Sequence, residues 1–80
     1  MISKGDKVKQ VGGWQPGTGL GRIYDVVAGR GDKWLNMDGT LDACGFVCSD
    51  NEFFIIDEYG YIRYQRYPKD SLTEWQKVTD

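Results

Sequence analysis

A glycine-rich stretch, GGWQPGTGLGR at residues 12–22, is the first part of the sequence that could carry chemistry. Its Gly17-x-Gly19-x-Gly21 spacing is similar to that of phosphate-binding loops, in which backbone N–H groups hold an anion at the start of a helix. The residues that follow, RIYDVV, have the composition of a strand, and no Gly-Lys-Ser/Thr sequence is present. The stretch therefore predicts a bent connection between two strands, with glycines for the bend and Pro16 for rigidity.

Trp14 stands inside this connection, where the turn itself does not require it. A tryptophan at such a position either folds back onto the sheet or stands exposed as an anchor for a partner. Because tryptophan is enriched at the energetic centres of protein interfaces, we include Trp14 among the candidate partner-binding residues.

The sequence contains two cysteines, Cys44 and Cys48, and no histidine. A tetrahedral zinc site needs four ligands, so the chain alone predicts no metal site. Both cysteines are expected to be reduced, small and partly buried. Without histidine the commonest general base is missing, and no serine–base pair can be recognised. We therefore expect a protein that is not an enzyme, with no cofactor and no small-molecule substrate.

Tyrosine and arginine gather in the segment YIRYQRY at residues 61–67. Alternate residues of a strand share a face, so Tyr61, Arg63 and Tyr67 are predicted to project together. Rings beside arginine suit single-stranded nucleic acid or a protein interface, and packing across strands is the third explanation. Carboxylates at positions 50, 52, 57 and 58 disfavour phosphates. The predicted partner is therefore a protein, bound through Trp14, Tyr61, Arg63 and Tyr67.

Short strands must position these residues. Apolar alternation, β-branched composition and turn signals predict strands at 6–11, 20–27, 33–37, 52–57 and 61–67. The tripeptide EYG at 58–60 predicts a tight hairpin between the last two. Several short strands at close spacing are typical of a small barrel or sandwich.

The two-residue period of these strands assigns their side chains to faces. Val8, Ile23 and Ile62 are predicted to face the core, with Val27 beside Ile23 and Tyr64 beside Ile62. The run Phe53-Phe54-Ile55-Ile56 is apolar on both faces, which predicts the most central strand. Four residues of the last strand are predicted to look outward: Tyr61, Arg63, Gln65 and Tyr67.

Two segments allow more than one interpretation. Residues 41–51 fit either a short strand around Phe46 and Val47 or an irregular loop. Residues 69–80 contain a Ser71-x-x-Glu74 capping box and apolar residues at helical spacing, but EWQKV also fits a strand. We expect one short helical turn near residues 70–75 and then a strand, with Trp75 packed on the barrel.

The 80 residues predict a single domain spanning 1–80, and 40% hydrophobic residues suit a folded globule. Residues 1–34 carry six basic and three acidic side chains, whereas residues 35–80 carry four basic and nine acidic ones. These halves are either solvated patches or edges for charged partners. No apolar run reaches membrane-spanning length, and the start MISKGDKVKQ does not look like a signal peptide, so we expect no membrane partner and a cytoplasmic location.

The opening of the chain resembles the KOW-type segment of SH3-like barrels. The resemblance rests on Lys4-Gly5-Asp6, on a first strand that contains Val8 and Val11, and on Gly21-Arg22-Ile23 with Val26 in a second strand. It covers residues 2–37. It implies a five-stranded, strongly bent barrel whose loops bind RNA, DNA or protein. Together with the strand pattern, the resemblance leads us to predict an all-β, small SH3-like barrel of five or six strands. The loop here is longer than usual and lacks the basic cluster of RNA-binding members.

The function expected from these features is that of a small interaction or inhibitor protein. Its size without catalytic residues is similar to that of bacteriophage accessory proteins, an analogy from size alone. The first alternative is nucleic-acid binding by the basic half, through Lys4, Lys7, Lys9 and Arg22. The second is a homo-oligomeric structural subunit.

Overall fold

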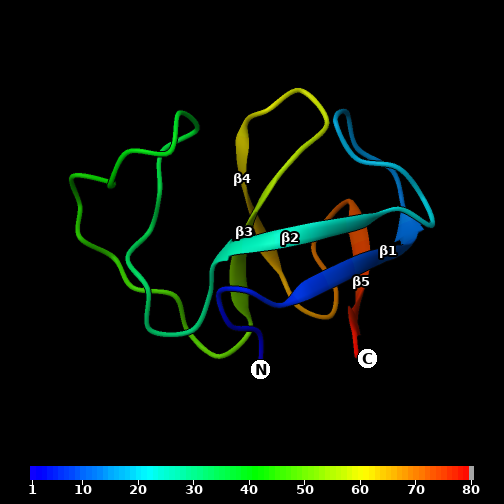
Figure 1. The fold of residues 1–80 in the computed structure, drawn as a ribbon, viewed down its shortest axis with the longest axis horizontal. Coiled ribbons are helices and arrows are strands. Elements are labelled where there is room, and N and C mark those ends of the chain that lie inside the picture. The colour runs from blue at the N-terminus through cyan, green and yellow to red at the C-terminus, as the bar shows by residue number, and fades with distance from the viewer. Residues whose placement is uncertain (80) are drawn as a thin grey trace.

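The computed structural model describes residues 1–79, which form five strands and their connecting loops (Figure 1). The strands are β1 (Lys7–Gly13), β2 (Ile23–Ala28), β3 (Glu52–Ile56), β4 (Ile62–Arg66) and β5 (Thr73–Val78). All pairs are antiparallel, and the strands form one sheet in the order β4-β3-β2-β1-β5. The described residues include no helix, so the all-β class is as predicted.

The sheet is strongly bent but is not closed into a barrel. In Figure 1, β1 and β2 run across the view while β3 and β4 run steeply. The pairing register shifts between Gln10 and Gly12 and between Val26 and Ala28, and such irregularities bend and twist strands. β4 and β5 remain at the two ends of the strand order, whereas the sequence predicted a closed barrel.

The main core lies inside the bend. Trp75 of β5 meets Phe53 edge-to-face at 5.8 Å between ring centroids and Tyr24 at 5.9 Å. Such edge-to-face pairs add to the stabilisation from the buried area itself. The predictions that Val8 faces the core and that Trp75 packs on the sheet are confirmed. The cluster contains Ile2, Val8, Tyr24, Val26, Phe53, Ile55 and Trp75.

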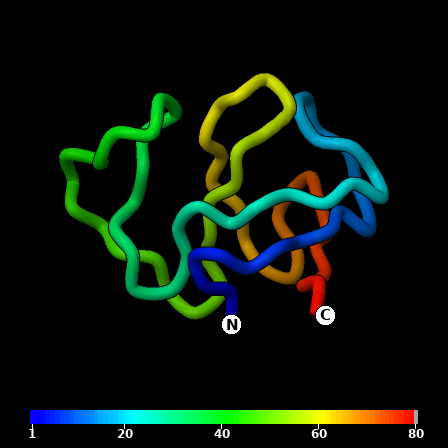
Figure 2. The backbone as a smooth tube through the Cα atoms, in the orientation of Figure 1, coloured from blue at the N-terminus to red at the C-terminus, as the bar shows by residue number. Residues whose placement is uncertain are grey.

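A second, smaller core lies on the opposite face of β3. Phe54 packs there with Ala28 and Cys48, and half-buried residues including Trp34, Ile62 and Tyr64 surround them. Residues 29–51, drawn in green in Figure 2, extend from one side of the sheet as a broad loop. Residues of this loop, such as Trp34 and Cys48, pack on this face of β3. β3 is therefore apolar on both faces because each face has its own cluster, as the FFII run predicted.

The expected strand at 33–37 is absent. This part of the long loop forms only two isolated bridges, Lys33–Val47 and Leu35–Leu41. The loop is held instead by Trp34, whose ring lies 5.0 Å from those of Phe46 and Tyr64. Residues 41–51 are thus an irregular loop, the second of the two interpretations.

The helical turn expected near residues 70–75 is also absent. The Asp70 carboxylate accepts the N–H groups of Arg66 at 2.8 Å and Ser71 at 2.7 Å, which forms a turn without a helix. β5 begins at Thr73 and pairs with β1 along its length. The gain from this pairing and from burying Trp75 outweighs the local helical signal, because propensity is weaker than tertiary packing.

The prediction that Ile23 faces the core is wrong. Ile23 is 53% exposed, whereas Tyr24, Val26 and Ala28 of the same strand are buried. The other set of alternate residues faces the core because the Tyr24 hydroxyl has hydrogen-bond partners where it is buried. It donates to Glu58 and accepts from the Gly19 N–H, both at 2.7 Å. Hydrogen-bonded in this way, a large ring is a better core residue than isoleucine at the neighbouring position.

Candidate functional site

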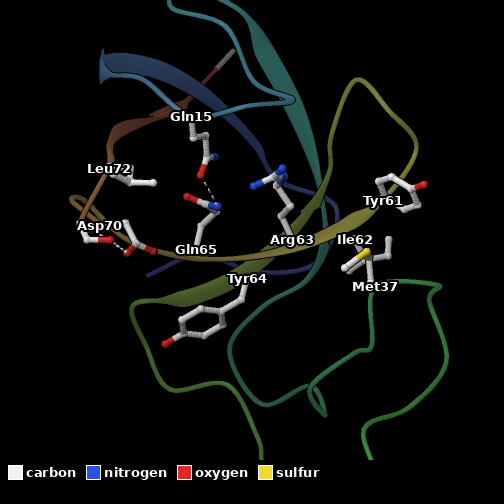
Figure 3. Close-up of a pocket in the computed structure, with 10 residues that line it drawn as sticks. Gln15, Met37, Tyr61, Ile62, Arg63, Tyr64, Gln65, Asp70 and Leu72 are labelled. Atoms are coloured by element: carbon white, nitrogen blue, oxygen red, sulfur yellow. Dashed lines mark hydrogen bonds between the residues drawn. The ribbon is translucent and has the colours of Figure 1, made fainter.

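A groove of about 400 Å³ runs along β4 (Figure 3). Its floor is β4 with the preceding Tyr61. Gln15 borders it from the β1–β2 connection, Met37 from the long loop, and Asp70 to Leu72 from the β4–β5 connection. We call this feature the β4 groove. It brings together three connections that are far apart in sequence.

Arg63 lies in the β4 groove and is held by a buried carboxylate. Its Nε lies 2.6 Å from Oδ2 of Asp57, whose side chain has no exposed surface. The other oxygen of Asp57 accepts the backbone N–H groups of Tyr59 and Tyr61 at 2.9 Å. Burial opposes ionisation of Asp57, but Arg63 and these two N–H groups outweigh it and hold the pKa of Asp57 below its usual value.

The glycine-rich connection packs directly on this ion pair. The Glu58 N–H donates to the Gly17 carbonyl at 2.8 Å, and residues 14–22 lie beside the β3–β4 turn in Figure 2. A Cβ at Gly17 would lie 2.7 Å from Asp57 Oδ2, so the backbone can approach only because residue 17 has no side chain. A strand, β2, follows the connection. Gly17 thus serves close packing between two turns.

A chain of polar side chains connects the core to the β4 groove. The Oε1 of Gln65 accepts hydrogen bonds from Trp75 Nε1 at 3.1 Å and from the Thr73 hydroxyl at 2.9 Å. Its Nε2 then faces Gln15 Oε1 at 3.5 Å, as the dashed line in Figure 3 shows. Because the Gln65 oxygen is occupied by two donors, its amide group is held in one orientation, with its Nε2 directed toward Gln15.

Trp14 stands beside the β4 groove rather than inside it. It is 71% exposed, and with Tyr59, which is 66% exposed, it lines a neighbouring hollow of about 270 Å³. Gln15 borders both hollows. The Trp14 N–H donates to the Leu72 carbonyl at 2.9 Å, which holds the backbone of this tryptophan while the ring stays in solvent. Of the two positions that the sequence allowed, Trp14 takes the exposed one.

Three of the four predicted partner-binding residues lie near one another. Tyr61 and Arg63 line the β4 groove, and Trp14 borders the adjoining hollow. The prediction that Tyr67 projects outward with them is wrong. Tyr67 packs against the main core with its ring 6.5 Å from that of Phe53, and its hydroxyl accepts the Lys77 N–H at 3.2 Å. The chain turns after Arg66, so the two-residue period no longer applies at Tyr67.

Gln65 was also predicted to look outward, but it is buried. β4 has aromatic or aliphatic residues on one parity and polar residues on the other, so hydropathy favours Ile62 and Tyr64 as the inner face. Both faces of β4 are in fact covered, and Ile62 and Tyr64 pack on the smaller cluster while Gln65 meets Trp75. A polar partner for a buried tryptophan N–H is the signal that sequence reasoning missed.

Further residues of the β4 groove were not singled out from the sequence. Met37 and Leu72 come from segments that were expected to be a strand and a helical turn, so their place beside β4 could not be foreseen. Exposed apolar residues in loops carry no periodic signal. Only the position of the loops relative to the sheet brings these two side chains to the same groove as Arg63.

The basic residues of the alternative nucleic-acid surface are all exposed, but two of them are paired. Lys7 lies 2.5 Å from Asp25 across β1 and β2, and Arg22 lies 3.0 Å from Glu58. No ion pair is recorded for Lys4 or Lys9 in residues 1–79. Carboxylates thus alternate with the cations on this surface.

The two thiols have different surroundings. Cys44 is exposed, whereas Cys48 is buried in the smaller cluster. The expectation that both are partly buried therefore fails for Cys44, because the turn at 42–45 points into solvent. Burial, with Glu52 and Asp32 nearby, raises the pKa of the Cys48 thiol to about 11. Within residues 1–79, no group of three or more His, Cys, Asp or Glu side chains is arranged to hold a metal ion.

Comparisons with protein-family models, with curated proteins and with solved structures find no match to this chain. The described residues also form no helix of the length and apolarity needed to span a membrane.

Proposed function

We propose that this chain is a non-enzymatic protein-binding module that uses the β4 groove and the adjoining Trp14. The observation that carries the proposal is the gathering of exposed apolar side chains around one groove. Met37 is 62% exposed, Leu72 56% and Tyr61 50%, and all three line the β4 groove. Apolar anchors with a charged group between them are typical of the centres of protein interfaces.

Arg63 supports a protein partner. Arginine and tyrosine are enriched in interfaces, and the Asp57 pair holds the Arg63 side chain in one position before any partner arrives. An arginine that is already ordered loses less conformational entropy on binding. Asp70 contributes a negative charge at the other end of the groove, so the groove suits a polar peptide surface better than a polyanion.

The SH3-like architecture is part of this proposal. Its support is the strongly bent five-stranded antiparallel sheet in which β1 pairs with both β2 and β5. The KOW-like residues of the opening, Lys4 to Asp6, lead into β1. Three of the connections between its strands border the groove described above.

The test compares variants in a pull-down from lysate of the source cells, with the captured proteins identified by mass spectrometry. Trp14→Ala and Tyr61→Ala remove two exposed rings, and we expect each to weaken capture of a partner about tenfold or more. Ile23→Ala is the matched control, because Ile23 is about as exposed as Tyr61 but borders neither hollow. Capture that both ring variants leave unchanged would reject the site.

The alternatives give different results. Binding to DNA or RNA that falls steeply between about 50 and 200 mM salt, and is lost on replacing Lys4 and Lys9, would favour nucleic acid instead. A molar mass that rises with concentration in light scattering would favour a homo-oligomer.

A further inference from the structure

The two end strands of the sheet differ in how their outer edges are closed. On β5, the Trp75 N–H donates to the Pro68 carbonyl at 2.7 Å, and the Lys77 N–H donates to the Tyr67 hydroxyl at 3.2 Å. The chain's own segment 67–68 therefore covers the outward donors in the middle of β5. Natural sheets commonly protect their edges in this way, because an open edge recruits other strands.

β4 has its protection at both ends but not in the middle. The Ile62 N–H donates outward to the Met37 carbonyl at 2.9 Å, and the Arg66 N–H donates outward to the Asp70 carboxylate at 2.8 Å. Outward groups recur every second residue of an antiparallel strand, and the pairs Phe53–Gln65 and Ile55–Arg63 face inward on the same ladder. Tyr64 therefore directs its N–H and C=O to the open edge, and its N–H donates to no acceptor within residues 1–79.

This open position lies in the β4 groove, to which Tyr64 contributes. We propose that the groove takes an extended segment of a partner protein, which adds to the sheet by pairing its backbone with the N–H and C=O of Tyr64. Such strand addition draws its affinity from main-chain hydrogen bonds and its specificity from the neighbouring side chains. The inference rests on the proposed function and specifies how the partner binds.

Arg63 defines the chemistry of that segment. Its Nε is bound to Asp57, whereas no bond is recorded for its two terminal nitrogens among the described residues, and the side chain keeps 30% of its surface exposed. In Figure 3 the guanidinium lies above β4, across the groove from Asp70 and Leu72. We therefore assign the occupant a carboxylate that meets Arg63, carried on an extended backbone whose apolar side chains contact Met37 or Leu72.

A second copy of this chain fits the edge less well than a slender segment. Pairing two β4 strands would need Ile62 and Arg66 to be open as well, and both are already bonded to Met37 and Asp70. Only the N–H of Tyr64 is open on this edge, and a loop lies on each side of it. An extended peptide can enter such a gap, whereas a folded sheet edge would meet the flanking loops.

The test uses an N-methyl group at Tyr64, which removes the outward N–H and keeps the side chain. The 80-residue chain can be assembled from two synthetic peptides joined at Cys44, and the unmodified chain assembled in the same way is the control. Both assembled chains are refolded, and circular dichroism and thermal melting check that they adopt the same fold. The probe is a displayed library of random linear nine-residue peptides, selected on the unmodified protein and then made individually.

We expect selected peptides to carry Asp or Glu and to bind the N-methylated protein about tenfold or more weakly, since one lost hydrogen bond plus steric block exceeds about 1.4 kcal/mol. Amide exchange of Tyr64 is expected to be fast in the free protein and slowed about tenfold or more in the complex, while Arg63 and Gln65 are protected in both. Replacing the acidic residue of the peptide by its amide is expected to weaken binding severalfold.

Equal affinity of the peptides for both proteins would overturn strand addition, and so would a selection that yields no binding peptide. Either result leaves the proposed function standing if Trp14→Ala still weakens capture of a folded partner about tenfold or more. A dimer that forms with the unmodified chain and disappears on N-methylation would assign the edge to a second copy and overturn the peptide occupant.

Discussion

The Arg63 side chain donates to Asp57 at 2.6 Å, and this bond joins the floor of the β4 groove to a carboxylate with no exposed surface. The same carboxylate orders the β3–β4 turn through the N–H groups of Tyr59 and Tyr61. One residue thus holds both the groove and the turn on which the glycine-rich connection packs. The stability of this end of the molecule depends on the pair.

Replacing Arg63 tests that dependence. We expect Arg63→Met to lower the free energy of unfolding by about 2–3 kcal/mol, because it leaves the Asp57 carboxylate buried without its cation. Arg66→Met on the same strand is the control, since the Arg66 side chain is exposed and donates to the Tyr64 hydroxyl at 3.2 Å rather than to a buried carboxylate. Urea denaturation measures both, and equal losses for the two variants would contradict the role of the pair.

Acid is expected to destabilise the fold. The pKa of Asp6 is lowered mainly by the Ser3 N–H, that of Glu52 mainly by the Tyr64 hydroxyl, and that of Asp57 by Arg63 and two N–H groups against the effect of burial. A carboxylate with a lower pKa in the folded state binds fewer protons there than in the unfolded state. Its contribution is therefore complete above the unfolded values of 3.8 and 4.5 and is lost as pH falls through the folded ones.

Urea denaturation between pH 7 and pH 2 checks this expectation. The free energy of unfolding should be nearly level from pH 7 to about pH 5 and should then fall continuously. A free energy that rises on acidification would contradict the lowered pKa values of Asp6, Glu52 and Asp57.

Gly13 and Gly21 have the same φ but different surroundings, so their alanine variants separate the cost of a steric clash from the cost of backbone strain. Gly13 and Gly21 both have φ of 80°, but a Cβ at Gly13 would lie 2.0 Å from the Leu72 carbonyl oxygen, and one at Gly21 would meet nothing within 4 Å. We expect Gly21→Ala to cost about 1–2 kcal/mol from the left-handed conformation alone. Gly13→Ala should cost at least about 2 kcal/mol more, because β1 and the β4–β5 connection must move apart.

Thermal and urea denaturation of the two alanine variants measure the difference. Equal destabilisation would show that the backbone at residue 13 can shift without cost, which would contradict the tight contact with Leu72.

The two cysteines are expected to react at very different rates. In the native protein at pH 8, a thiol reagent should modify the exposed Cys44 rapidly, whereas Cys48 is buried and its pKa is raised to about 11. Reactivity follows the thiolate fraction and access, so both factors protect Cys48. Mass spectrometry of timed samples should show one label in the native state and two in urea, and rapid double labelling of the native protein would contradict the burial of Cys48.

Much of the sheet could be predicted from local pattern. β1, β2, β3 and β4 lie where alternation and β-branched residues placed them, and the doubly apolar run of β3 correctly marked a strand buried on both sides. These signals are local, so a single sequence suffices. β5 was predicted only in part, since the spacing of Leu72, Trp75 and Val78 also fits a helix, and pairing with β1 decides between the two.

The candidate site was harder to predict because it depends on long-range placement. Trp14, Tyr61 and Arg63 were identified by residue type, which is the property that matters at an exposed surface. Gln65 was misplaced because both faces of β4 are covered, so the two-residue period does not separate inside from outside. Tyr67 was misplaced because the chain turns after Arg66, where that period ends. The open edge at Tyr64 depends on the positions of Met37 and Asp70 beside β4, and no local sequence pattern predicts those positions.

The loop of residues 29–51 supplies one face of the molecule without adding a strand to the sheet. Its turn at 42–45 is exposed at Cys44 and Gly45 and is held by the Cys44 N–H, which donates to Asp42 at 2.8 Å. Lengthening a loop costs little, about 0.6 kcal/mol for each doubling. This turn is therefore the place where extra residues, whether acquired by natural insertion or added as a reporter sequence, would leave the strand order undisturbed.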